Sequence, residues 1–145
     1  MKKLLLTVLT SFILIACSSS DNNYENEFLP SQSFDTGTTI NTSFPQYNDL
    51  LYPGNHVVLY GYGLSGIVVY YSGSSYVAFE LSDPNHYYQS CSSLTVNGVL
   101  ATCGCEDENT YDILTGQPNG STTGSYGLTP YFVEVNGSII RVYNN

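Results

Sequence analysis

Short apolar stretches, separated by glycine, proline, asparagine and serine residues, recur along the chain after residue 33. Such runs of β-branched and aromatic residues between turn residues are typical of β-strands. This part of the chain shows no convincing 3.6-residue apolar period over three turns, as an amphipathic helix would. The pattern predicts strands at 38–42, 56–60, 67–71, 76–81, 93–96, 99–102, 111–113, 131–135 and 139–142.

Two of the predicted connections carry a strong hairpin signal. Asn97-Gly98 lies between the fifth and sixth predicted strands, and Asn136-Gly137 lies between the last two. Asn and Gly tolerate the positive φ that a type I′ turn requires, so we expect tight antiparallel hairpins there. Many short strands, with no second domain or internal repeat, predict an all-β antiparallel sandwich or small barrel.

A glycine-rich stretch at 61–66 reads Gly-Tyr-Gly-Leu-Ser-Gly and matches the dinucleotide-binding fingerprint letter for letter. That fingerprint must open a helix whose N-terminus holds a pyrophosphate. Here the β-branched strand 67–71 follows instead. We therefore interpret the stretch as a connection between two strands.

The start of the chain has the features of an export signal. Lys2 and Lys3 precede an apolar stretch at 4–15, which is too short to span a bilayer comfortably, and the small residue Ala16 precedes Cys17. The arrangement resembles a bacterial lipoprotein signal, in which Cys17 becomes the acylated first residue. A serine rather than an acidic residue follows the cysteine, and by resemblance to lipoproteins of double-membrane bacteria this favours the outer membrane.

The expected organisation has three parts. Residues 18–33 are rich in Ser, Asn and acidic side chains and have too little apolar surface to offset the entropy of ordering. We expect a signal peptide at 1–16, a lipidated flexible tether at 17–33 and one β domain at 34–145.

Charge and cysteine content limit the possible partners. Removing the leader leaves Arg141 as the single basic residue against 12 acidic ones, so phosphate backbones would repel the domain and we expect no nucleic-acid partner. Fourteen Tyr and no Trp fit a strand-rich protein. Cys91, Cys103 and Cys105 are an odd number of thiols, which permits one disulfide in an oxidising compartment and leaves one sulfur over.

The middle of the chain follows a characteristic order of motifs. A strand ending Ala-Phe-Glu at 78–80 leads into Asp-Pro-Asn-His at 83–86, a hairpin follows, and Cys-Gly-Cys-Glu at 103–106 precedes an aromatic strand and a Gly-Gln-Pro turn at 116–118. This order resembles the Rieske iron–sulfur domain family, in which a Cys-x-His box and a Cys-Pro-x-His box flank a hairpin. The flanking strands extend the resemblance to about residues 36–143. It implies a Rieske-like all-β fold.

Most of the cluster ligands of that family are replaced in this chain. The family holds one iron with two Cys and the other with two His. Aligned with the first box, Asp83 stands for Cys and Asn85 for His. In the second box Cys103 occupies the Cys position and Glu106 the His position, with one extra residue before the aromatic strand. His86 lies one place late, which would redirect its side chain. We therefore expect no cluster and no metal, with Cys103, His86, Asp83 and Glu106 as residual candidates for metal binding.

The resemblance also implies a disulfide. Many Rieske domains carry two further cysteines that are not ligands and that join the two cluster loops. Cys91 follows the first box and Cys105 occupies the middle of the second, so the implied bridge is Cys91–Cys105, with Cys91–Cys103 as the alternative. In the chain-entropy model, closing a loop of about 15 residues contributes about 3 kcal/mol.

Without its ligands, the fold does not imply the electron transfer of the family. We expect a non-enzymatic envelope lipoprotein whose Rieske-like domain acts as a binding or structural module. Its partners would be the lipid bilayer, through acylated Cys17, and an unidentified envelope protein or ligand. The alternative is a redox protein that holds a 2Fe–2S cluster or a single metal through Cys103, Cys91, His86 and an acidic residue.

Overall fold

The computed structural model describes residues 26–144, so the expected signal peptide, Cys17 and the first part of the tether lie outside the described residues. The described part forms eleven strands and two short 3₁₀ helices, and the prediction of an all-β protein is confirmed. In chain order the elements are β1 (Phe34–Asp35), β2 (Ile40–Asn41), η1 (Pro45–Leu51), β3 (His56–Leu59), β4 (Ile67–Tyr71), β5 (Tyr76–Glu80), η2 (Ser90–Ser92), β6 (Leu94–Asn97), β7 (Leu100–Cys103), β8 (Thr110–Asp112), β9 (Pro118–Asn119), β10 (Pro130–Asn136) and β11 (Ile139–Asn144).

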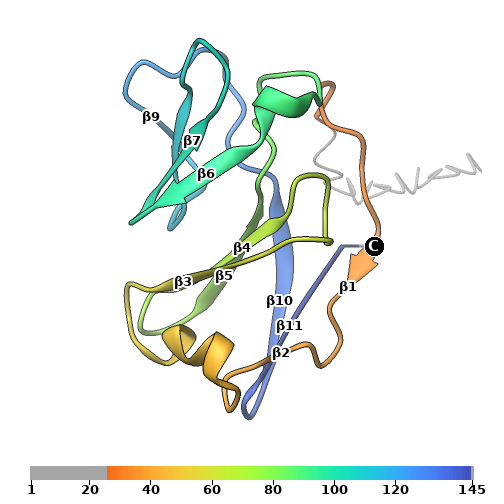
Figure 1. The fold of residues 1–145 in the computed structure, drawn as a ribbon, viewed down its shortest axis with the longest axis vertical. Helices are drawn as coiled ribbons and strands as arrows, with labels where there is room; N and C mark the ends of the chain where they lie inside the picture. The colour runs from red at the N-terminus through yellow and green to blue at the C-terminus, as the bar shows by residue number, and fades with distance from the viewer. Residues whose placement is uncertain (1–25, 145) are drawn as a thin grey trace, which may run out of the picture.

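Two antiparallel sheets make up the domain (Figure 1). The larger sheet has the order β1-β11-β10-β5-β4-β3, with β2 also paired to β11, and the smaller has the order β6-β7-β8-β9. Strand β5 pairs directly with β10, through Ala78 and Tyr131 among others. The smaller sheet is therefore formed by the chain segment that connects these two neighbouring strands of the larger sheet. We call the β5–β6 connection (81–93) and the β7–β8 connection (104–109) the tip loops.

Strand β4 lies at the centre of the core, buried on both of its faces. Its continuous apolar run alternates between two clusters, with Val68 and Tyr70 packed beside Tyr111 of the smaller sheet, and Ile67 and Val69 in the cluster on the other face. A strand covered on both faces loses the apolar-polar alternation of a half-exposed strand. This placement explains why β4 is the most uniformly apolar strand in the sequence.

The hairpins form where the sequence predicts them, but with a different turn. Asn97 is the last residue of β6 and pairs with Leu100, so the turn residues are Gly98 and Val99. Gly98 has a φ of +61° whereas Val99 does not have a positive φ. A positive φ at the first turn residue alone is the pattern of a type II′ turn, which needs glycine at that position. The β10–β11 hairpin repeats the arrangement, and the type I′ prediction is wrong.

The glycine-rich loop between β3 and β4 encloses the carboxylate of Glu80, which is 1% exposed. The backbone N–H groups of Leu64 and Ser65 donate to its two oxygens at 2.8 and 2.9 Å, and the Tyr131 hydroxyl donates at 2.6 Å. Gly63 has a φ of +67°, and a Cβ at this position would overlap the Glu80 carboxylate. The loop therefore binds a carboxylate of the protein itself, that of Glu80. This agrees with the interpretation of residues 61–66 as a connection between two strands.

The described end of the expected tether packs on the domain instead of extending from it. The Asn26 side chain donates to the Pro84 carbonyl at 2.7 Å, and the Phe28 ring meets the Tyr87 ring edge-on at 5.1 Å. Leu29 is 8% exposed. Phe28 and Leu29 supply the apolar surface that the preceding Ser and Asn run lacks, so this stretch is held against a tip loop.

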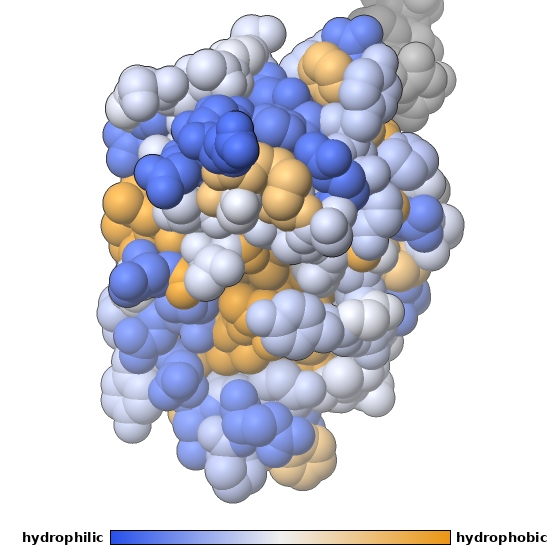
Figure 2. All heavy atoms as spheres, turned by 45° about the horizontal axis from the view of Figure 1, so that its top comes forward, coloured by the Kyte–Doolittle hydropathy of each residue, from blue (hydrophilic) through white to orange (hydrophobic). Residues whose placement is uncertain are grey.

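The surface agrees with the acidic composition. With the tip turned forward, hydrophilic side chains cover much of the visible surface and apolar side chains show in smaller patches between them (Figure 2). Across residues 26–144, no helix has the length and apolar character needed to cross a membrane.

Candidate functional site

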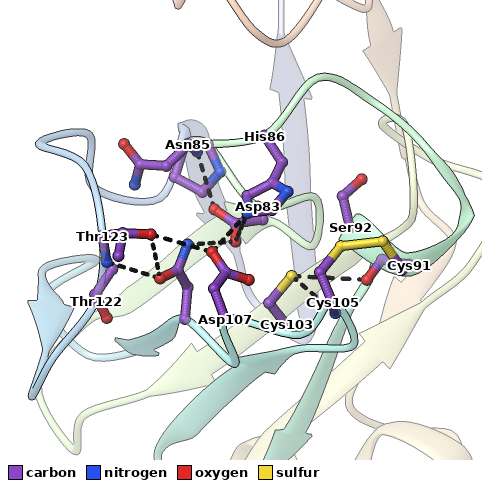
Figure 3. A network of polar contacts seen from close by, with 12 residues as sticks. Asp83, Asn85, His86, Cys91, Ser92, Cys103, Cys105, Asp107, Thr122 and Thr123 are labelled. Carbon is purple, nitrogen blue, oxygen red and sulfur yellow. Dashed lines mark hydrogen bonds and ion pairs between the residues drawn. A yellow bond between two sulfur atoms is a disulfide. The ribbon is translucent and has the colours of Figure 1, made fainter.

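The tip loops bring four potential metal ligands together (Figure 3). The β5–β6 connection supplies Asp83 and His86, β7 ends in Cys103, and the β7–β8 connection supplies Asp107. One candidate ligand atom from each of these residues lies within 4.8 Å of the others. The site therefore combines sulfur, nitrogen and oxygen donors at the end of the domain.

A disulfide between Cys91 and Cys105 joins the two tip loops, with the Cα atoms 4.9 Å apart. This is the pair that the resemblance implies, and Cys103 remains a free, buried thiol. The ligand set of the redox alternative included Cys91. That part of it is wrong, because a sulfur in a disulfide is not a thiolate donor.

Asp83 is the most deeply buried member of the site and is 0% exposed. Its Oδ1 accepts hydrogen bonds from the Tyr111 hydroxyl and from the Asn85 N–H at 2.9 Å, and its Oδ2 accepts one from the Asn109 amide at 3.0 Å. Burial, together with the bond to Asp83, raises the pKa of Tyr111 far above its usual value. Three donors thus fix a carboxylate where the Rieske pattern has a cysteine.

His86 and Asp107 form a close pair across the two loops. The Nε2 atom of His86 lies 2.6 Å from Oδ2 of Asp107 and 3.9 Å from Oδ2 of Asp83. Burial works to raise the pKa of Asp107, but the hydrogen bonds from His86 and from the Thr123 hydroxyl outweigh it and hold that pKa below its usual value. Asp107 Oδ1 is buried and has no hydrogen-bond partner among the described residues.

Cys103 lies between the other residues of the cluster and the Cys91–Cys105 disulfide. Its thiol is 3% exposed, donates to the Cys91 carbonyl at 3.6 Å and accepts from the Cys105 N–H at 3.4 Å. Burial raises the pKa of Cys103 to about 12, and the nearby Asp83 and Asp107 carboxylates add to the rise. In this environment the sulfur stays protonated and is a poor nucleophile.

Glu106, the residue aligned with the second-box histidine, does not belong to the site. Its side chain is exposed, and Asp107 takes its place in the cluster. A turn closed by the Glu108 N–H and the Cys105 carbonyl at 3.1 Å, with Glu108 at a φ of +47°, carries the chain through this loop. The extra residue that the sequence shows in this box is the signal for the shift.

The first box is shifted in the same direction. Asn85, aligned with the first-box histidine, exchanges two hydrogen bonds with the Tyr126 backbone, at 2.9 and 3.0 Å. His86 instead reaches the cluster, because a turn closed by its N–H and the Asp83 carbonyl at 3.3 Å bends the chain back. His86 is one of the residual candidates for metal binding, and the structure brings it to the cluster. In each loop, the residue found in the cluster comes one place after the residue aligned with a family histidine: His86 after Asn85, and Asp107 after Glu106.

The donor set does not fit a Rieske cluster. That cluster needs two thiolates on one iron and two imidazoles on the other. The tip loops and the end of β7 offer one free thiol, Cys103, and one imidazole, His86, and the remaining donors are the carboxylates of Asp83 and Asp107. The set is better suited to a single ion with mixed ligands.

Comparisons with known proteins return similar solved structures but no family. No protein-family model and no curated protein matches the chain. A chain of the complex of reduced oxygenase and oxidized ferredoxin in carbazole 1,9a-dioxygenase is 25% identical, over 63% of this chain and 82% of that one, with a TM-score of 0.44. The ferredoxin of carbazole 1,9a-dioxygenase from Nocardioides aromaticivorans IC177 is 20% identical, over 77% of this chain and 97% of that one, with a TM-score of 0.44. A quaternary ammonium Rieske monooxygenase in complex with L-carnitine is 18% identical, over 66% of this chain and 29% of that one, with a TM-score of 0.47. The solved structures to which this chain is similar include ferredoxins and a Rieske oxygenase.

Proposed function

We propose that this protein is a lipid-anchored module of the bacterial envelope whose Rieske-like domain works without a 2Fe–2S cluster, as a binding or structural unit rather than an enzyme. The observation that carries the proposal is the burial and hydrogen bonding of Asp83. At the position of a cluster cysteine, a fully buried carboxylate accepts three hydrogen bonds from within the domain.

The hydrogen bonds of Asp83 support a structural use of this position. Tyr111 and Asn109, which donate to it, are themselves fully buried and come from β8 and the loop before it. Buried polar groups that are mutually satisfied stabilise a unique arrangement, and removing one partner leaves the others unpaired. Here Asp83 ties one tip loop to the smaller sheet, a role that a cluster-binding cysteine would not fill.

The charge distribution supports anchoring by acyl chains on Cys17. Arg141 is the only Lys or Arg in the described part of the chain, and it is paired with Asp35 at 2.7 Å and with Glu134 at 2.9 Å. No basic patch therefore faces outward from residues 26–144 to bind anionic lipid, and the acidic surface is repelled by it. Stable attachment then requires more than one acyl chain, as a mature bacterial lipoprotein carries.

Iron content tests the absence of a cluster. The full-length protein, purified in detergent without oxygen, is expected to be colourless and to contain less than about 0.1 iron per chain, because cluster assembly needs all four ligands. Elemental analysis and the visible spectrum measure this. A visible band that bleaches on reduction, together with stoichiometric iron and sulfide, would show that the cluster is present.

Membrane fractionation tests the anchor. Cys17→Ser is expected to abolish acylation and move the protein out of the membrane fraction, whereas Cys103→Ser, a matched change at a buried thiol, leaves it there. Mass spectrometry of the N-terminal peptide reports the lipid directly. A Cys17→Ser protein that stays in the outer-membrane fraction after a high-salt wash would contradict the lipoprotein assignment.

A further inference from the structure

The cluster at the tip has more buried negative charge than the domain compensates. Asp83 is fully buried, and Asp107 has one oxygen that is buried without a hydrogen-bond partner within residues 26–144. Arg141, which is engaged by Asp35 and Glu134 on β1 and β10, is the only Arg or Lys in that part of the chain. His86 is the one basic side chain among the four residues of the cluster. Buried charges in proteins are paired or coordinate metals.

Each carboxylate of the cluster has acceptor capacity left. A carboxylate offers about four lone-pair sites. Oδ2 of Asp83 accepts the Asn109 amide at 3.0 Å, and its remaining side is turned toward His86, 3.9 Å away. Oδ1 of Asp107 accepts no hydrogen bond from the described residues, while its Oδ2 takes those of His86 and Thr123. One carboxylate oxygen of each residue lies within 4.8 Å of the Cys103 sulfur and of a ring nitrogen of His86.

We propose that the tip binds a single zinc ion through Asp83, His86, Cys103 and Asp107. The four candidate ligand atoms lie within 4.8 Å of one another, and sulfur, imidazole nitrogen and carboxylate oxygen are the donors that zinc takes in four-coordinate sites. The inference rests on the proposed absence of a 2Fe–2S cluster, because the two metal groups would compete for Cys103. Thiolate and imidazole ligands make magnesium and calcium poor occupants, since both prefer oxygen ligands alone.

The surroundings of the four residues are those of a supported metal site. Hydrogen-bonded partners that orient the ligands are a regular part of such sites. Tyr111 and Asn109 hold the Asp83 carboxylate, and Thr123 holds that of Asp107. The Cys91–Cys105 disulfide fixes the two loops that contribute the ligands relative to each other. The domain thereby holds the ligands near one another before the ion arrives.

The proton balance of binding is defined. The ion replaces the proton on the Cys103 sulfur, forming a zinc–sulfur bond and releasing that proton to solvent. It also replaces the hydrogen bond between His86 Nε2 and Asp107 Oδ2, and the hydrogen on Nε2 then leaves that nitrogen, to Nδ1 of the same ring if the ring is neutral or to solvent if the ring is protonated. No oxidant or reductant takes part. The charge at the site rises by one unit when one proton is released to solvent and is unchanged when two are released.

Zinc titration of the full-length protein in detergent tests the proposal, after chelator treatment and with a chromophoric chelator as competitor. We expect one zinc per chain and a rise in thermal midpoint on binding. Asp107→Asn is expected to weaken binding about 100-fold or more, because loss of a supporting group alone costs 10- to 100-fold. The matched control is Glu106→Gln, one residue away, exposed and outside the cluster, which should bind within about twofold of the wild type.

Cobalt substitution provides a second measurement that does not depend on a variant. Co²⁺ at this site should give a thiolate-to-metal charge-transfer band, and that band should be absent in Cys103→Ser. Equal loss of zinc binding in Asp107→Asn and Glu106→Gln would overturn the site, as would a Co²⁺ complex without the thiolate band. Absence of zinc binding by a colourless, iron-free wild type would overturn the zinc site alone. Stoichiometric iron and sulfide would instead overturn the proposed function as well.

Discussion

Replacing Glu80 with alanine is expected to lower the free energy of unfolding by about 4 kcal/mol or more. The carboxylate is buried and accepts hydrogen bonds from two backbone N–H groups of the glycine-rich loop and from the Tyr131 and Ser82 hydroxyls. Alanine would leave these four donors facing an empty space. An unsatisfied buried donor costs about 1–3 kcal/mol, and water that enters the space recovers part of the sum.

Chemical denaturation of the full-length protein measures this loss. Glu27→Ala is the matched control, because Glu27 is exposed and the substitution removes the same side chain from the surface. It should leave the unfolding midpoint nearly unchanged. If Glu80→Ala cost no more than the control, the loop between β3 and β4 would not depend on its carboxylate. The anion-like role given to Glu80 would then be wrong.

Replacing Cys91 with serine is expected to cost about 3 kcal/mol, since the disulfide closes a loop of about 15 residues. Cys105→Ser should cost the same, and the double substitution little more, because both remove one covalent link. The measurement is again denaturant unfolding, with and without reductant. Reductant should lower the stability of the wild type to that of Cys91→Ser and leave the variant unaffected.

Peptide mapping under non-reducing conditions accompanies this experiment. Cys103 should be alkylated only after unfolding, as a free buried thiol, and Cys91 and Cys105 should be recovered in one linked peptide. If reductant did not change the stability of the wild type, the Cys91–Cys105 disulfide would not contribute to stability as expected. Recovery of Cys103 in a disulfide would show that the second box is paired differently.

Much of the fold is predictable from the sequence because its signals are local. Each of the nine predicted strands overlaps an observed one, and both Asn-Gly hairpins form. The missed strands are β1 and β9, which are two residues long and form only through partners elsewhere, β1 pairing with β11 at the other end of the chain. The helix η1 was missed as well, since seven residues are too few to show a helical period.

The composition of the candidate site was harder to predict, because it depends on the direction in which side chains leave two tight turns. Residue types and spacing place Asp83 and Cys103 at the site, and the structure agrees. The same alignment puts Glu106 at the second histidine position, but Glu106 is exposed and Asp107 lies in the cluster, while His86, one place after the first histidine position, lies in it too. A shift of one residue in a turn changes which side chain faces inward. The spacing of residues in the sequence does not show such a shift.

The packing of Asn26 against Pro84 sets how far a tip loop can lie from an anchor at Cys17. Cys17 lies nine residues before Asn26, and a fully extended stretch of that length reaches about 30 Å. Under the proposed acylation of Cys17, the tip loop at Pro84 would stay within about that distance of the bilayer surface, while the β10–β11 turn lies at the opposite end of the domain (Figure 1). A molecule that binds the tip of the anchored domain would then do so near the lipid headgroups, and the β10–β11 turn would be the end farther from the point of attachment.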